Sequence, residues 1–259
     1  MRIIIVRHGD PNYEIDSLTE TGWKEAELVA ERIAKLDVKE FYVSPLGRAQ
    51  DTASCTLKKM NRKAITYDWL KEFPPTIIRP DREGKSICWD WLPQDWSKEN
   101  RFYDVTKWAD TKEMQEGHVK EEYDKVCKGL DKILKEHGYV RENNYYRVKK
   151  ANSDTIVFFC HFGAECVLLS RLLNVSPMIL WHGFCAAPAS VTTVYTEERR
   201  KGIASWRVAA FGDISHLYAA GEEPSFSARF CECYDNADER HDYMCKIAES
   251  FIYGFVFLQ

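Results

Sequence analysis

The sequence predicts a three-layer α/β/α sandwich, in which a mostly parallel central sheet is covered by helices on both faces. Two observations lead to this fold class. Short runs of β-branched and aromatic residues alternate along the chain with longer segments whose apolar residues recur at helical spacing. The strand-like runs are continuously apolar, which is typical of parallel strands that are covered on both faces. With 45% apolar and 29% charged residues, the chain has the composition of a globular protein.

The predicted elements follow one another in a regular order. Strands are expected at residues 3–6, 40–44, 155–160, 190–196 and 206–212. Helices are expected at residues 20–36, 46–60, 117–137 and 163–174. The polar stretch 139–154 is expected to be a surface connection. We predict a single domain over residues 1–259, with a lid-like insertion at about 73–110 and a C-terminal extension at about 221–259.

The insertion is unusually aromatic, because it carries the four tryptophans Trp89, Trp91, Trp96 and Trp108. Such a composition argues against a disordered linker, and a long insertion in a compact domain is typically a functional loop or lid. Packing onto the domain is favoured for most of these rings, and contact with an apolar part of a substrate is the alternative. Solvent exposure is expected for the neighbouring cations, with a second anionic group as their alternative partner: Arg79, Arg82 and Lys85.

Charge and termini exclude several classes of protein. A net charge of −4 provides no broad basic face for a nucleic acid. No apolar run approaches the ~20 residues that span a bilayer, and the start of the chain indicates a buried strand rather than a secretion signal. We therefore expect a cytoplasmic protein with no nucleic-acid or membrane partner, and we leave a homodimer open.

The nine cysteines are an odd number and cannot all pair within one chain, so reduced thiols are favoured. One loose cluster near the C-terminus has the residue types that zinc prefers, but its spacing does not match common zinc sites: Cys231, Cys233, His241 and Cys245. We predict no metal and no cofactor.

Basic side chains follow three of the predicted strands. Arg7 and His8 come directly after the first strand, Arg48 lies in the first turn of the helix after the second, and His161 directly follows the third. Ligands bind outside the carboxyl ends of parallel strands, so these side chains are expected to meet at one edge of the sheet. Their charges repel one another unless an anion joins them. Phosphate fits best, because arginine offers planar, bidentate donors to its oxygens.

These motifs resemble those of the histidine phosphatase superfamily, also called the phosphoglycerate mutase-like family. The resemblance covers most of residues 1–70 and 150–215 and rests on Arg7-His8-Gly9, Leu18-Thr19 with Gly22, Ser44-Pro45-Leu46-Gly47-Arg48-Ala49 with Thr52-Ala53, and His161.

The resemblance implies a role for each matching residue. His8 is implied to be the phosphorylated nucleophile, with Arg7, Arg48 and His161 forming the phosphate pocket around it. The family's general acid lies in a Leu-x-Glu pattern, which this chain matches at Glu72. Weaker candidates for the acid are Asp10, Asp81 and Glu83.

The chain also departs from the family pattern. Glu14 stands where many members have an asparagine that touches the phosphate, and Asn12 is the substitute that we consider. The run typical of sugar-phosphate mutases is missing after Glu72, which favours a phosphatase. We therefore expect a metal-independent phosphatase acting on a small phosphorylated metabolite. The alternatives are a phosphoglycerate mutase-like phosphomutase and a catalytically weak, phosphate-binding regulatory protein.

Overall fold

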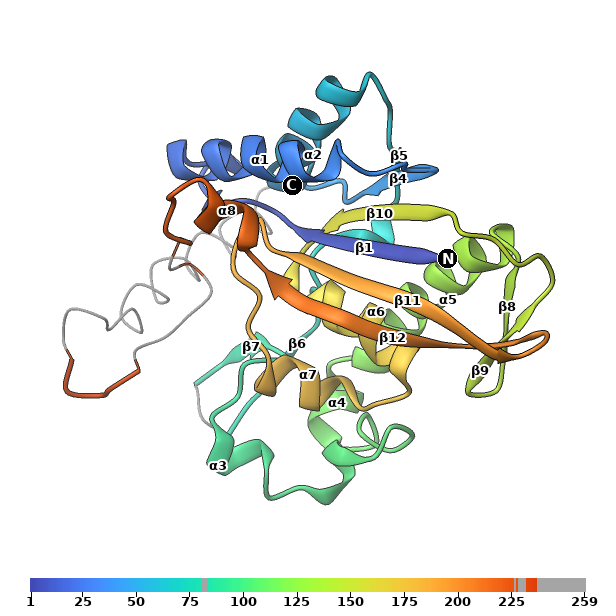
Figure 1. Ribbon diagram of the computed structural model, residues 1–259. Helices are drawn as coiled ribbons and strands as arrows, with labels where there is room; N and C mark the ends of the chain where they lie inside the picture. The colour runs from blue at the N-terminus through green and yellow to red at the C-terminus, as the bar shows by residue number, and fades with distance from the viewer. Residues whose placement is uncertain (81–82, 226, 228–231, 237–259) are drawn as a thin grey trace, which may run out of the picture.

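A mixed eight-stranded sheet forms the centre of the molecule (Figure 1). The structure is a computed structural model, and it describes residues 1–80, 83–225, 227 and 232–236. In spatial order, the strands are β5 (Ile65–Thr66), β4 (Glu40–Val43), β10 (Thr155–Cys160), β1 (Arg2–Arg7), β11 (Val191–Arg200), β12 (Ile203–Asp213), β9 (Tyr145–Val148) and β8 (Tyr139–Glu142). The first four run parallel to one another, and from β11 onward each strand is antiparallel to its neighbour.

The remaining elements surround this sheet. The helices are α1 (Glu20–Ile33), α2 (Gly47–Met60), α3 (Pro93–Trp96), α4 (Lys112–Glu116), α5 (Val119–Glu136), α6 (Phe162–Leu173), α7 (Pro177–Gly183) and α8 (Ser215–Ala219). Two short 3₁₀ turns are η1 (Asp68–Leu70) and η2 (Asn100–Tyr103). Two small separate sheets pair β2 (Pro11–Asn12) with β3 (Ser17–Leu18), and β6 (Thr76–Ile78) with β7 (Lys85–Ile87).

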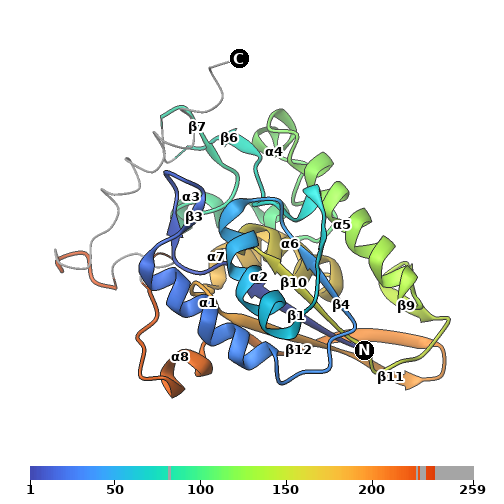
Figure 2. The same ribbon diagram turned by 90° about the horizontal axis from the view of Figure 1, so that it is seen from above.

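Helices cover both faces of the sheet, which confirms the predicted three-layer α/β fold. Ile4 and Val6 of β1 pack into one core with Val29 of α1. Ile3 and Ile5 point to the opposite face, into the core that includes α5 and α6. Burying such a side chain contributes about 1.5–3 kcal/mol, and cover on both faces explains why the strand is apolar throughout. Figure 2, seen from the α1 and α2 side, shows these two helices lying over the sheet.

The antiparallel half of the sheet differs from the mostly parallel arrangement that the sequence predicts. Residues 139–154 are not a plain surface connection, because β8 and β9 form a hairpin there. Asn143 takes the left-handed conformation in its turn, with φ of 51°. Tyr139 and Tyr146 are buried against Trp206, with ring centroids 5.9 and 5.8 Å away. The polar composition of this stretch therefore hid the two buried residues, Tyr139 and Tyr146, that pack it onto the sheet.

The insertion packs against the sheet domain through its aromatic residues. Trp91 and Trp108 are buried, and the Trp91 backbone N–H donates to His182 Nε2 of α7 at 3.0 Å. Trp96 stacks on the same His182 ring at 4.9 Å. The expectation of a solvated Arg79 is wrong, because this residue is 2% exposed and donates to the Trp89 carbonyl at 3.0 Å. Lys85 is exposed as expected, and Arg82 lies outside the described residues.

Two further features concern the described ranges alone. None of their helices combines the length and the apolar character that crossing a membrane requires. They contain no cluster of three or more histidine, cysteine or acidic residues suited to a metal ion. From the loose cysteine cluster, Cys233 is described and exposed, while Cys231, His241 and Cys245 lie outside the described residues.

Candidate active site

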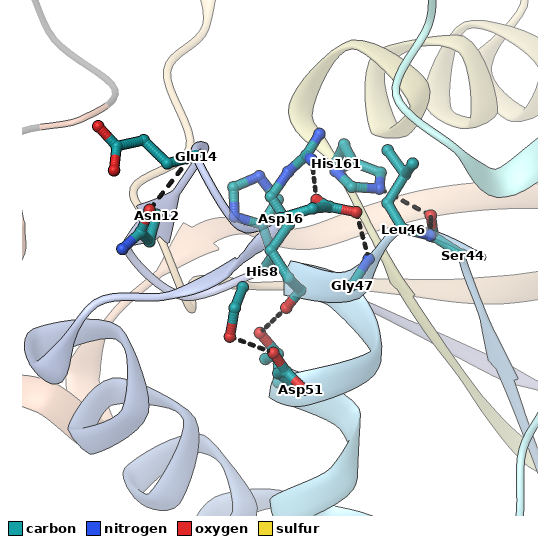
Figure 3. A network of polar contacts seen from close by, with 12 residues as sticks. His8, Asn12, Glu14, Asp16, Ser44, Leu46, Gly47, Asp51 and His161 are labelled. Carbon is teal, nitrogen blue, oxygen red and sulfur yellow. Dashed lines mark hydrogen bonds and ion pairs between the residues drawn. The ribbon is translucent and has the colours of Figure 1, made fainter. Parts of the chain in front are cut away.

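Two histidines meet where the parallel strands β1 and β10 end. The rings of His8 and His161 lie with centroids 5.0 Å apart, and both residues are buried. The backbone of His8 donates to the carbonyl of Cys160 at 3.0 Å, which continues the pairing of the two strands into the site. Figure 3 shows the two rings side by side above the start of α2.

Hydrogen bonding fixes which nitrogen of His8 is free. Its Nδ1 lies 2.8 Å from the carbonyl oxygen of Gly9, an acceptor, so Nδ1 carries the proton. The lone pair is then left on Nε2. Burial, and secondarily the charges of Arg7 and Arg48, hold the pKa of His8 well below its usual range. A buried, neutral imidazole with a free Nε2 is suited to nucleophilic attack.

The loop that carries His8 is held by close backbone packing. A Cβ at Gly9 would lie 2.6 Å from the carbonyl oxygen of Gly22 in α1, so neither the RHG motif nor the helix start tolerates a larger residue there. The Gly9 N–H also donates to Thr52 Oγ1 of α2 at 3.0 Å. The sequence motifs at Gly22 and Thr52 therefore both contact the loop that carries His8.

Three buried nitrogen atoms around His8 have no hydrogen-bond partner among the described residues. They are Arg7 Nε, Arg48 Nε and His161 Nδ1. His161 Nε2 lies 2.8 Å from the Ser44 hydroxyl, which also accepts from the Leu46 N–H at 3.2 Å. Unsatisfied buried donors are costly. An anion bound between the two arginines would accept from both guanidinium groups, and from His161 Nδ1 when that nitrogen carries the ring proton.

The two arginines are oriented by groups outside this set of donors. Arg7 Nη1 donates to the carbonyl of Ala186. Arg48 Nη1 donates to Asp16 Oδ1 at 2.6 Å, and the other oxygen of Asp16 accepts from the Gly47 N–H at 2.7 Å (Figure 3). Sequence reasoning missed Asp16, although its place between two motifs and its short, turn-forming side chain are a usable signal.

Asn12 and Glu14 belong to the loop that precedes Asp16. The amide oxygen of Asn12 accepts from the Glu14 N–H at 3.1 Å and closes a local turn. Figure 3 shows the Glu14 side chain pointing away from His8 and His161. The substrate-binding role of Asn12 stays a prediction, because its amide oxygen is used within the loop.

Glu72 lies beside the start of α6. Its Oε1 accepts from the N–H groups of Phe73 at 2.7 Å and Ala164 at 3.1 Å. Burial raises the pKa of this carboxyl above its usual value, while Arg48 and Arg7 oppose the shift through their charges. Because these two arginines also act on His8, the carboxyl shares their electrostatic environment. A carboxyl with a raised pKa is suited to donate a proton.

The alternative acids are placed less well. Both carboxylate oxygens of Asp10 are engaged, with the hydroxyls of Ser227 and Thr19. Glu83 is exposed in the insertion, and Asp81 lies outside the described residues.

A buried carboxylate, Glu25, joins the loop that carries His8 to the chain beyond β12. Its Oε2 accepts from the Asp10 N–H at 2.7 Å, and its Oε1 accepts from the Ser225 N–H at 3.2 Å. Burial raises the pKa of this group. Sequence reasoning assigned Glu25 to an amphipathic helix and gave no signal for this contact.

Glu165, in the first turn of α6, was also missed. The residue is 1% exposed, and its Oε1 has no hydrogen-bond partner among the described residues. Burial raises the pKa of Glu165 to about 7, against the opposing effects of Thr192 and Arg7. A lone acidic residue in a helix pattern does not reveal such burial.

Comparison with known proteins places the chain in a family. The model of the histidine phosphatase superfamily (branch 1) matches residues 3–209. The chain belongs to this superfamily. Among curated proteins, it is similar to a 2,3-bisphosphoglycerate-dependent phosphoglycerate mutase of Thermoplasma acidophilum, with 33% identity over 79 residues. That match spans 27% of this chain and 40% of the mutase.

Solved structures share the fold of this superfamily member. A phosphoserine phosphatase from Entamoeba histolytica, in complex with 3-phosphoglyceric acid, is 20% identical with a TM-score of 0.54, covering 83% of this chain and 98% of its own. A mycobacterial glucosyl-3-phosphoglycerate phosphatase is 16% identical with a TM-score of 0.53, covering 82% and 98% respectively. At these identities the similarity establishes the fold.

Proposed function

We propose that this protein is a phosphatase that hydrolyses a small phosphomonoester through a phosphohistidine on His8. The observation that carries the proposal is that buried nitrogens of Arg7, Arg48 and His161 have no hydrogen-bond partner among the described residues, beside a His8 ring whose Nε2 holds the lone pair. We call Arg7, His8, Arg48 and His161 the phosphate side of the site. Membership of the histidine phosphatase superfamily supports phosphoryl transfer of this kind.

In the first step, Nε2 of His8 attacks phosphorus. A nitrogen–phosphorus bond forms as the bond from phosphorus to the ester oxygen breaks, and Glu72 gives its proton to the departing oxygen. Arg7, Arg48 and His161 stabilise the charge on the transferring phosphoryl oxygens. The raised pKa of Glu72 and the lowered pKa of His8 favour the protonation states that this step needs.

In the second step, water replaces the alcohol. Glu72, now ionised, accepts a proton from the water as the oxygen attacks phosphorus, and the nitrogen–phosphorus bond breaks. Phosphate leaves and Glu72 is protonated again. These steps use side chains of the chain alone.

A phosphomutase of the same family is the second candidate, supported by the partial similarity to a phosphoglycerate mutase. The two differ in the acceptor of the phosphoryl group. Release of inorganic phosphate without a bisphosphate primer supports the phosphatase, whereas strict dependence on such a primer, with return of phosphate to the substrate, supports the mutase.

The test of the nucleophile is His8→Asn, compared with His118→Asn at an exposed histidine. We expect His8→Asn to lower kcat by at least about 10⁴-fold, because the covalent route is lost. Wild type and His118→Asn should form an acid-labile phosphohistidine, detectable by mass spectrometry after rapid quenching. Full turnover by His8→Asn would overturn the mechanism, and no hydrolysis across a broad phosphoester panel would favour a regulatory phosphate-binding protein.

A further inference from the structure

Aromatic side chains stand where the proposed mechanism places the leaving group. Glu72 protonates the departing oxygen, so the leaving group must lie next to this carboxyl. A Cβ at Gly163 would lie 2.7 Å from Glu72 Oε1 and 3.0 Å from Trp89 Nε1. The carboxyl and the indole therefore approach the same point at the start of α6. We call Glu72, Trp89 and Phe162 the leaving-group side of the site.

Trp89 is held firmly in this position. Its Nε1 donates to the Phe73 carbonyl at 3.3 Å, and its own carbonyl accepts from the buried Arg79 at 3.0 Å. Its ring meets the ring of Phe162 edge-on, with centroids 6.1 Å apart and an angle of 71°. These contacts fix the orientation of the two rings before a ligand binds.

Part of this aromatic surface remains accessible. Trp91 and Trp108 of the same insertion are buried in the core, but Trp89 and Phe162 are only partly buried. A third ring stands across the phosphate side, where Tyr13 is 44% exposed and its centroid lies 5.4 Å from the guanidinium carbon of Arg48. Trp89 and Phe162 pack against the core with part of their surface and keep another part exposed, which a ligand can contact.

The cations of the site are used by the phosphoryl group. Arg7 and Arg48 are the cations whose charges act on the pKa of both Glu72 and His8. The buried cation on the leaving-group side, Arg79, donates to the backbone carbonyl of Trp89 at 3.0 Å. A leaving group with its own carboxylate or second phosphate needs a further cation to offset its desolvation. An aromatic ring has no such need and gains by contact with other rings.

We propose that the leaving group is an uncharged aromatic alcohol, so that the substrate is an aryl or arylalkyl phosphomonoester whose ring packs against Trp89 and Phe162. This inference rests on the proposed function and names the substrate class of that same site.

The test compares benzyl phosphate with ethyl phosphate. Both release an alkoxide of similar basicity, so both need the proton of Glu72, and they differ in the ring. We expect kcat/KM for benzyl phosphate to exceed that for ethyl phosphate by about tenfold or more in wild type. 3-Phosphoglycerate, with its carboxylate, should be a poorer substrate than benzyl phosphate.

Variants locate the source of this preference. Trp89→Ala should bring the benzyl-to-ethyl ratio close to one, mainly through a higher KM for benzyl phosphate. Trp96→Ala is the matched control, since Trp96 is a partly buried tryptophan of the same insertion that stacks on His182. It should keep the wild-type ratio. If Trp89→Ala does not fold, Phe162→Leu provides the same comparison, because the ratio is measured within one protein.

The outcomes separate the two proposals. Equal rates for the two esters in wild type, an unchanged ratio in Trp89→Ala and Phe162→Leu, or preference for 3-phosphoglycerate would overturn the aromatic leaving group while phosphohistidine formation on His8 stands. Absence of both phosphohistidine and hydrolysis with every ester would overturn the proposed function and this inference together.

Discussion

The phosphate side and the leaving-group side of the site are built by different means. Arg7, His8 and His161 lie at the ends of neighbouring parallel strands, so the ladder of the sheet sets their spacing. Trp89 comes from the insertion and reaches the site through side-chain and carbonyl contacts. The strand ends hold the phosphate-binding residues in a fixed geometry. The sequence of an insertion that packs on the sheet domain can vary without disturbing the strands. We therefore expect the two sides to be separable by mutation.

The largest separable effect is expected from Glu72→Gln. Loss of the acid should lower kcat/KM for ethyl phosphate by about 10²–10⁴-fold. p-Nitrophenyl phosphate should be affected far less, because its leaving group departs without a proton. Inhibition by vanadate, which reports the phosphate side, should be retained. Equal losses for both esters would show that Glu72 acts on the phosphate side instead.

The pH dependence of kcat/KM in wild type and Glu72→Gln tests the role of Glu72 further. The pKa of Glu72 is raised, so its protonated form is lost as pH rises through a value above its usual one, and kcat/KM for ethyl phosphate should fall there in wild type. The pKa of His8 is lowered, so activity should survive at a pH well below 6.5 before the nucleophile is protonated. The alkaline fall should be absent in Glu72→Gln.

Gly163→Ala tests the close contact between the start of α6 and Glu72. Alanine normally favours a helix over glycine by about 1 kcal/mol, but its methyl group would lie 2.7 Å from Glu72 Oε1. We expect kcat/KM to fall by about tenfold through displacement of the acid, and thermal stability to fall as well, because the same methyl group would lie 3.0 Å from Trp89 Nε1. Gly183→Ala is the control, because a Cβ there meets no atom within 4 Å. Equal activity of both variants would contradict the close contact.

Glu165→Gln is expected to change stability more than turnover. The pKa of Glu165 is raised to about 7 in the folded protein, so folding binds a proton and wild-type stability falls as pH rises from the unfolded value toward 7. Removing this ionisation should raise the free energy of unfolding at pH 8 by about 3 kcal/mol relative to wild type. At pH 4 the two proteins should be similar. Urea unfolding at both values gives the measurement, and a constant difference would contradict it.

Sequence patterns predicted the parts of the molecule that depend on local order. The proximity of Arg7, His8 and His161 could be predicted from the sequence, because each follows a parallel strand and parallel strands end at one edge of the sheet. The hairpin at residues 139–154 could not, since its two buried tyrosines stand among polar residues. Contacts of Glu25, Glu165 and Asp16 depend on segments that meet only after folding. A short periodic pattern does not encode such long-range pairs.

The two hydrogen bonds of Glu25 show that residues beyond the family match contact the loop that carries His8. The family match stops at residue 209, but one oxygen of Glu25 is satisfied by the backbone of Ser225. A chain trimmed to the family boundary would leave that oxygen without this donor, while the other oxygen of Glu25 accepts from the Asp10 N–H in the loop that carries His8. A residue beyond the family match thus helps to hold the loop that carries His8. We therefore expect a chain that ends at residue 209 to be less stable around Glu25 than one that includes Ser225.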